Sequence, residues 1–226
     1  MNIILYLGCL LAGCLISVFW KPAYRVADIL AKVYLWLALL MAVSFWIFYF
    51  AGIKNPATLR IISQELSWAG IVAHVILGYL VTTMAIALKD RSADAGTFRP
   101  VLNTTLWGMT ITYGNTFLIA TVGKSLNMPE MISFFKQSGY ALWFLYFIMA
   151  AETAGAIGVL SHFKLRMGIQ ATIGLLLIMA GAVYTHWHNG DPFSDSYAAV
   201  AQLITGLLLL TLYFLERKFG RLVMAR

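Results

Sequence analysis

Seven long apolar stretches run through this chain, separated only by short connections. A stretch of roughly 20 apolar residues is long enough to cross the hydrocarbon core of a bilayer as one helix. The connections carry proline or glycine at Lys21-Pro22, Asn55-Pro56, Arg99-Pro100, Met128-Pro129 and Asn189 to Pro192, and such residues typically end helices. The predicted helices cover residues 2–20, 28–53, 67–88, 101–122, 138–161, 165–187 and 196–214.

The composition agrees with this pattern. Of the 226 residues, 61% are hydrophobic and 11% are charged, whereas a soluble domain carries about 25% charged residues. A disordered chain and a disulfide scaffold are excluded, because apolar residues dominate and only 2 residues are cysteine. The sequence therefore predicts an all-α, polytopic membrane protein with seven transmembrane helices.

The lysines and arginines favour one orientation in the membrane. Short cytoplasmic loops are enriched in these residues. One side of the predicted topology has four such residues, at Lys54, Arg60, Lys124 and Lys136, and all the others fall on the opposite side. We expect the N-terminus outside and the basic C-terminal tail in the cytoplasm. The net charge of +7 is then explained by anionic lipid headgroups, so no nucleic-acid partner is expected.

Ionisable residues inside predicted helices are costly, so each one needs a partner or a purpose. Glu152 lies about ten residues from the cytoplasmic end of its helix by the rise of about 1.5 Å per residue. At that depth its neighbours have hydroxyl groups, at Thr112, Tyr113, Thr172 and Thr205. Small residues around Glu152 would let another helix approach closely. Two interpretations remain: a carboxyl group that handles protons beside a quinone, or a hydrogen-bonded clamp between helices.

A second set of polar residues is predicted at one depth nearer the outer face. His74, Asn115 and Gln202 could hydrogen-bond the carbonyl groups of a bound quinone, and the redox interpretation also predicts a pocket lined by Glu152, Tyr113 and aromatic side chains. They could equally hydrogen-bond one another across a packed helix interface.

A third set closes the sixth predicted helix, where His186 and His188 precede Asp191. A metal site, a catalytic role for His186 and interfacial anchoring are all compatible with these residue types. Residues two apart on a helix point to different sides, which weighs against a shared ion. A haem between His74 and His186 would require matching depths. His162, at the cytoplasmic end of its helix, is expected to be a solvated loop residue.

The C-terminal half carries a series of residues in a characteristic order and spacing. These are Gly123-Lys124, Phe134-Phe135, Gly139, Glu152, Met179, Ala182, His186 and Gly190-Asp191-Pro192. On these residues the segment from about 106 to 217 resembles the DoxX-like family of small four-helix membrane proteins. The resemblance implies a four-helix bundle in which Glu152 and His186 are the inherited polar positions, and a link to quinone-dependent redox systems.

These observations define the expected organisation and function. Residues 1–100 form three N-terminal transmembrane helices, and residues 101–226 form the DoxX-like bundle with a basic tail. The first hypothesis is a bacterial inner-membrane subunit of a quinone-linked respiratory or sulfur-compound redox system, with Glu152 and His186 catalytic. The alternative is a non-catalytic anchor, scaffold or assembly factor. No motif for an intrinsic cofactor or metal is present, so a bound quinone, membrane lipid and protein partners of a redox complex are the expected ligands.

Overall fold

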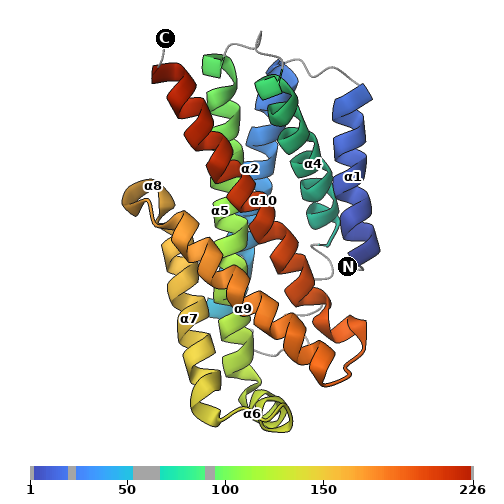
Figure 1. Ribbon diagram of the computed structural model, residues 1–226, viewed down its shortest axis with the longest axis vertical. Helices are drawn as coiled ribbons and strands as arrows, with labels where there is room; N and C mark the ends of the chain where they lie inside the picture. The colour runs from blue at the N-terminus through green and yellow to red at the C-terminus, as the bar shows by residue number, and fades with distance from the viewer. Residues whose placement is uncertain (1–2, 20–23, 53–66, 90–94, 225–226) are drawn as a thin grey trace. The chain divides into compact units, whose positions relative to one another are not determined.

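The computed structural model describes residues 3–19, 24–52, 67–89 and 95–224 of the chain. Within these ranges all regular secondary structure is helical, which confirms the predicted all-α fold. Figure 1 labels the helices in chain order. Their bounds are α1 Ile3–Phe19, α2 Tyr24–Phe50, α4 Ser67–Lys89, α5 Ala95–Leu126, α6 Met128–Gln137, α7 Leu142–Leu160, α8 His162–Leu165, α9 Gly168–His188 and α10 Phe193–Met224.

The lengths and hydropathies of these helices identify a multi-pass membrane protein. Among the described residues, four helical stretches are long and apolar enough to span a bilayer: Tyr24–Phe50, Leu142–Leu160, Gly168–His188 and Phe193–Lys218. Two shorter apolar stretches, in α1 and α4, accompany them. Large apolar side chains such as Trp36 and Leu177 are 71% and 70% exposed. Such exposure is expected for surfaces that contact lipid. The count of seven crossings stays a prediction.

Several helix boundaries differ from those predicted, and three of the differences concern proline or charged residues. Arg99-Pro100 does not end a helix, because α5 starts at Ala95 and contains Pro100. Pro100 is the sixth residue of α5, past the first four N–H groups that have no partner in a helix, so it removes one hydrogen bond within the helix without ending it. Met128-Pro129 opens the short helix α6, which the sequence reading missed. Helix α10 continues past residue 214 to Met224, because charged residues with good helix propensity follow its apolar part.

Some predictions fall outside the described residues. They concern the helix ends at Lys21-Pro22 and Asn55-Pro56, and the charges at Lys54, Arg60 and Arg91.

The chain packs as two compact units. The first comprises Met1–Ile111 and Thr211–Arg226, and the second comprises Thr112–Leu210. Helices α5 and α10 therefore contribute to both units. The predicted domains, residues 1–100 and 101–226, are a different division from these units, and they stay a prediction.

In the first unit, α1 and α4 lie side by side (Figure 1). Glycines bring their backbones together: a Cβ atom added at Gly13 would lie 2.0 Å from the Val75 carbonyl oxygen, and one at Gly78 would lie 2.1 Å from the Leu10 carbonyl oxygen. A buried hydrogen bond of 2.9 Å between Ser17 Oγ and Thr83 Oγ1 joins the same helices. This interface follows the small-residue packing that is common between transmembrane helices.

The second unit contains α6 to α9, the C-terminal part of α5 and the N-terminal part of α10. Helix α6 lies across the end of this unit and is seen almost end-on in Figure 1. Its apolar Met131, Ile132 and Phe135 are half-buried, whereas Glu130 and Lys136 are exposed. Helix α6 therefore covers the end of the unit at which α5 ends and α7 begins.

Candidate functional site

Helices α7 and α9 approach closely around Glu152, as the small residues in α7 predict. A Cβ atom added at Gly155 would lie 2.6 Å from the Leu175 side chain, and one added at Gly158 would lie 2.7 Å from Ala171 Cβ. Glu152 is therefore one turn from a tight helix contact, on the buried side of α7. Its side chain is 1% exposed.

Lys124 is the partner of this buried carboxylate. It lies in the last turn of α5, and its Nζ donates to Glu152 Oε1 at 2.6 Å and also to Oε2. The Lys124 side chain is 22% exposed. One ammonium group thus neutralises the carboxylate inside the unit. Because Glu152 is buried and Lys124 is partly exposed, the pair extends from the interior of the unit toward its surface.

The pair differs from the sequence-based expectation in two ways. Lys124 was assigned to an outer loop, but α5 continues to Leu126 and includes it. The expected layer of hydroxyl groups does not supply the observed hydrogen bonds: Thr205 Oγ1 donates to the Ala201 carbonyl, and Thr172 Oγ1 has no hydrogen-bond partner among the described residues. A cation is the more effective partner, because a buried anion needs a counter-charge more than a neutral donor. The need of a buried carboxylate for a counter-charge could have indicated a nearby lysine, but the predicted loop position of Lys124 pointed away from it.

Gln202 lies in the same layer of the unit as Glu152. Helix α9 contacts α7 where Leu175 meets Gly155. It contacts α10 where Leu176 meets Gly206, since a Cβ atom added at Gly206 would lie 2.7 Å from the Leu176 side chain. Glu152 precedes Gly155 by three residues, or about 4.5 Å along α7. Gln202 precedes Gly206 by four residues, or about 6 Å along α10. Both helices run antiparallel to α9, so the two side chains belong to one level.

Tyr113 lies one turn from this layer. Its hydroxyl oxygen would be 2.5 Å from a Cβ atom at Gly206, so the glycine makes room for the phenol. Tyr113 is fully buried and its ring packs edge-on against Phe117, with centroids 5.1 Å apart. The unit therefore holds a phenol close to the level of the carboxylate and the amide.

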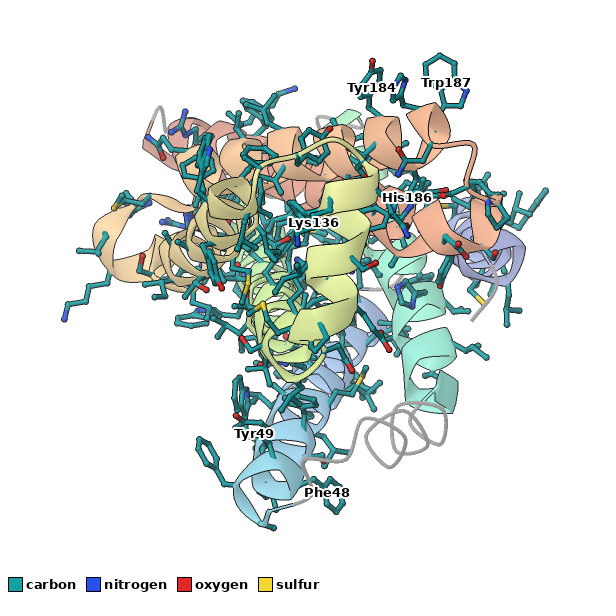
Figure 2. All side chains as sticks on the ribbon, turned by 90° about the horizontal axis from the view of Figure 1, so that it is seen from below. Phe48, Tyr49, Lys136, Tyr184, His186 and Trp187 are labelled. Atoms are coloured by element: carbon teal, nitrogen blue, oxygen red, sulfur yellow. The ribbon has the colours of Figure 1, made fainter. Side chains whose placement is uncertain are left out.

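A second polar group lies at the end of α9. His186 Nδ1 is 2.7 Å from Asp191 Oδ2, and the imidazole lies beside the ring of Phe134 of α6, with centroids 5.1 Å apart. Figure 2 shows His186 on the side of α9 that faces α6, whereas Tyr184 and Trp187 point away from the unit. His188 stacks on Tyr184 instead, so the two histidines contact different partners.

Two further hydrogen bonds lie at the same end of the unit. They join Ser138, Tyr140, Thr185 and Asn189, which we call the polar cap. Asn189 Nδ2 donates to Ser138 Oγ at 2.8 Å, and the hydroxyl groups of Tyr140 and Thr185 are 2.9 Å apart. The polar cap joins the connection between α6 and α7 to the end of α9. Within the described part of the chain, no three His, Cys, Asp or Glu side chains are grouped so that they could hold a metal ion.

A comparison with known protein families finds a match for this unit. Residues 108–212 match the DoxX-like family. This C-terminal part of the chain belongs to that family. The match confirms the resemblance read from the sequence, with closer limits, and it contains the whole of the second unit, Thr112–Leu210. Neither a curated protein nor a solved structure matches the chain.

The other predicted site residues have these positions. Tyr113, Asn115, Gln202 and His186 belong to the DoxX-like segment, and His74 lies on α4 of the first unit. The suggested hydrogen bonding of His74 with Asn115 and Gln202 stays a prediction, as do all catalytic and ligand-binding roles.

His162 is where the sequence reading of the DoxX-like segment was wrong. It was expected to be a solvated loop residue, but it is the first residue of α8 and is only 4% exposed. The short helix α8 folds its first side chain inward and leaves Lys164 and Arg166 exposed. The DoxX-like segment therefore buries an imidazole as well as the Glu152 carboxylate.

Proposed function

We propose that the chain is the membrane subunit of a quinone-linked respiratory or sulfur-compound redox system of the bacterial inner membrane. The observation that carries the proposal is the buried Lys124–Glu152 pair in the DoxX-like segment. The proposed orientation has the N-terminus outside and the C-terminal tail in the cytoplasm. A partner protein with a haem, flavin or metal supplies the electrons, since the sequence has no cofactor-binding motif.

Quinone reduction consumes protons as well as electrons. A quinone becomes a quinol by taking two electrons from the redox partner and two protons from its surroundings. In the proposal Glu152, as the neutral acid, gives a proton to a quinone oxygen, and then takes up another from water. Lys124 stabilises the carboxylate between these events, because its Nζ contacts both carboxylate oxygens.

The proposal places a quinone head group near the levels of Glu152 and Tyr113, where side chains carry hydrogen-bond donors. Quinone carbonyl oxygens accept hydrogen bonds, and Lys124, the Gln202 amide and the Tyr113 hydroxyl are possible donors. The Gln202 Oε1 atom is buried and has no hydrogen-bond partner among the described residues. A buried oxygen of this kind is available to a ligand and can accept from the hydroxyl group of a quinol.

A second candidate function is a non-catalytic anchor, scaffold or assembly factor. The polar cap favours it, because its hydrogen bonds fix the end of the unit on which Tyr184 and Trp187 are 55% and 77% exposed. In this alternative a protein partner docks at that end, and the Lys124–Glu152 pair holds helices together.

The experiment compares Glu152→Gln with Glu130→Gln, a matched change of an exposed glutamate on α6. Membranes of the native host provide the protein level and quinone-dependent activity, and gentle purification provides the bound quinone and partners. The proposal predicts normal levels of both variants, with activity lost only in Glu152→Gln. If Glu152→Gln loses protein level and activity together while Glu130→Gln keeps both, the scaffold function replaces the redox function.

A further inference from the structure

Buried polar groups follow one another along the axis of the second unit at intervals of about one helical turn. We propose that they form a proton path through this unit, which we call the polar ladder, with water molecules between the groups. Its members are Glu152, Gln202, Tyr113, Thr172 and His162. This inference goes beyond the proposed function, because a path for protons requires no quinone.

The order of the ladder follows from the helix contacts. Glu152 and Gln202 form its first level, and the Tyr113 hydroxyl, beside Gly206 and Leu176, forms the second. Thr172 lies four residues before Leu176 on α9, which places it about 6 Å further along the axis. These steps run away from α6 and toward the end of the unit where α8 lies.

The last level is His162. Ala171, the neighbour of Thr172, meets Gly158 of α7, and His162 follows Gly158 by four residues, again about 6 Å further. His162 is 4% exposed, and Lys164, two residues further along α8, is exposed. At the opposite end the ladder opens through Lys124, which is 22% exposed. The ladder therefore extends from one end of the unit to the other.

Two of its atoms indicate that further hydrogen-bonding molecules belong there. Thr172 Oγ1 and Gln202 Oε1 are buried without a hydrogen-bond partner among the described residues. A threonine in a helix can bond to a carbonyl of its own preceding turn, as Thr205 does, but Thr172 does not. Buried polar atoms without a protein partner are typical positions for internal water.

Successive levels of the ladder are about one helical turn apart along the axis. In the proposal, water molecules bridge the polar groups of neighbouring levels, since one water spans about twice a usual hydrogen-bond length. Hydroxyl groups of tyrosine and threonine pass protons by accepting one while they release another. Glu152 and His162 bind and release protons themselves, and the Gln202 oxygen orients a water.

Proton flux through the purified full-length chain in liposomes tests this inference. A pH-sensitive dye is enclosed, and a potassium gradient with valinomycin draws protons inward without any quinone. We expect flux above that of protein-free liposomes, and its loss in Thr172→Val, which keeps the shape of the side chain but removes the hydroxyl. Thr116→Val is the matched control, because Thr116 bonds to the Thr112 carbonyl of its own helix, and it should conduct as the wild type does.

Two results would overturn the path: flux of the wild type equal to that of protein-free liposomes, or undiminished flux in Thr172→Val. Thr172→Ser keeps the hydroxyl and separates loss of the path from loss of folding, since it should restore the flux. Quinone-dependent activity without proton flux would contradict the path alone, whereas proton flux from a chain that supports no quinone-dependent activity in native membranes would leave the path intact and contradict the proposed function.

Discussion

The two units bury different kinds of polar side chain. In the first unit the described buried polar residues carry hydroxyl groups, as in the Ser17–Thr83 hydrogen bond between α1 and α4. The second unit buries a carboxylate and an imidazole, Glu152 and His162, in addition to hydroxyl groups. Burial of a hydroxyl with a partner costs little, whereas burial of an ionisable group is expensive.

This difference separates packing from chemistry. The first unit brings its helices together through glycine and neutral hydrogen bonds, which is sufficient for a stable bundle. The second unit retains the expensive groups, and it is also the part that matches the DoxX-like family. We therefore expect variants in the two units to fail in different ways.

The largest effect on stability is expected in the first unit, for Gly78→Ala. The new Cβ would meet the Leu10 carbonyl at 2.1 Å, and backbone atoms cannot move aside without separating α1 from α4. Gly8→Ala is the matched control, because nothing lies within 4 Å of its Cβ position. Gly78→Ala should lose about 3 kcal/mol of unfolding free energy relative to this control, measured by unfolding in mixed detergent micelles. Equal stability of the two variants would show that the close α1–α4 contact is wrong.

The next largest effect is expected for Lys124→Met in the second unit. It leaves Glu152 buried without its counter-charge, whereas the reverse change, Glu152→Gln, leaves an ammonium that is 22% exposed and can reach water. We expect Lys124→Met to cost about 2 kcal/mol, less than a fully buried pair because the carboxyl can take up a proton. Glu152→Gln should cost less than Lys124→Met in the same unfolding measurement. The reverse ranking would contradict the burial of Glu152.

A smaller effect is expected for Gly206→Ala, which sharpens the comparison with Gly78. Its Cβ would also be crowded, at 2.5 Å from the Tyr113 hydroxyl and 2.7 Å from Leu176, but these are the ends of side chains. Side chains can shift, so the stability loss should stay below about 1 kcal/mol. The Tyr113 hydroxyl must move, and proton flux should fall more than stability does. A loss as large as that of Gly78→Ala would remove the distinction between the two units.

The smallest effect is expected for Ser17→Ala. The hydrogen bond to Thr83 joins two neutral groups, and such bonds between membrane helices average about 0.6 kcal/mol. A double-mutant cycle with Thr83→Ala measures this coupling. A coupling as large as that of a charged pair would contradict the view that the first unit uses only weak polar contacts.

Apolar patterning predicted most of the fold, and local chemistry explains the exceptions. Each of the seven apolar stretches contains a helix in its described part, because membrane insertion depends on runs of apolar residues. Hydropathy does not say where a helix ends, so the extensions of α5 and α10 were missed. Proline can end a helix but it can also start one, as Pro129 does in α6.

The candidate site was harder to predict, because it depends on contacts between distant residues. Glu152 stood out as a carboxyl in an apolar segment, but its partner Lys124 is 28 residues away and looked like a loop charge. His162 looked solvated because its neighbours are polar, and the fold of α8 buries it. Sequence indicates which residues are expensive to bury, whereas tertiary packing decides which partners they meet.

The most direct test of the central claim is a double-mutant cycle of Lys124→Met and Glu152→Gln in the full-length protein. If the two side chains form the buried pair, the double variant should be more stable than the sum of the single losses predicts, by at least about 1 kcal/mol. Additive losses would show that Lys124 and Glu152 do not interact, and would contradict the site on which the proposed function rests.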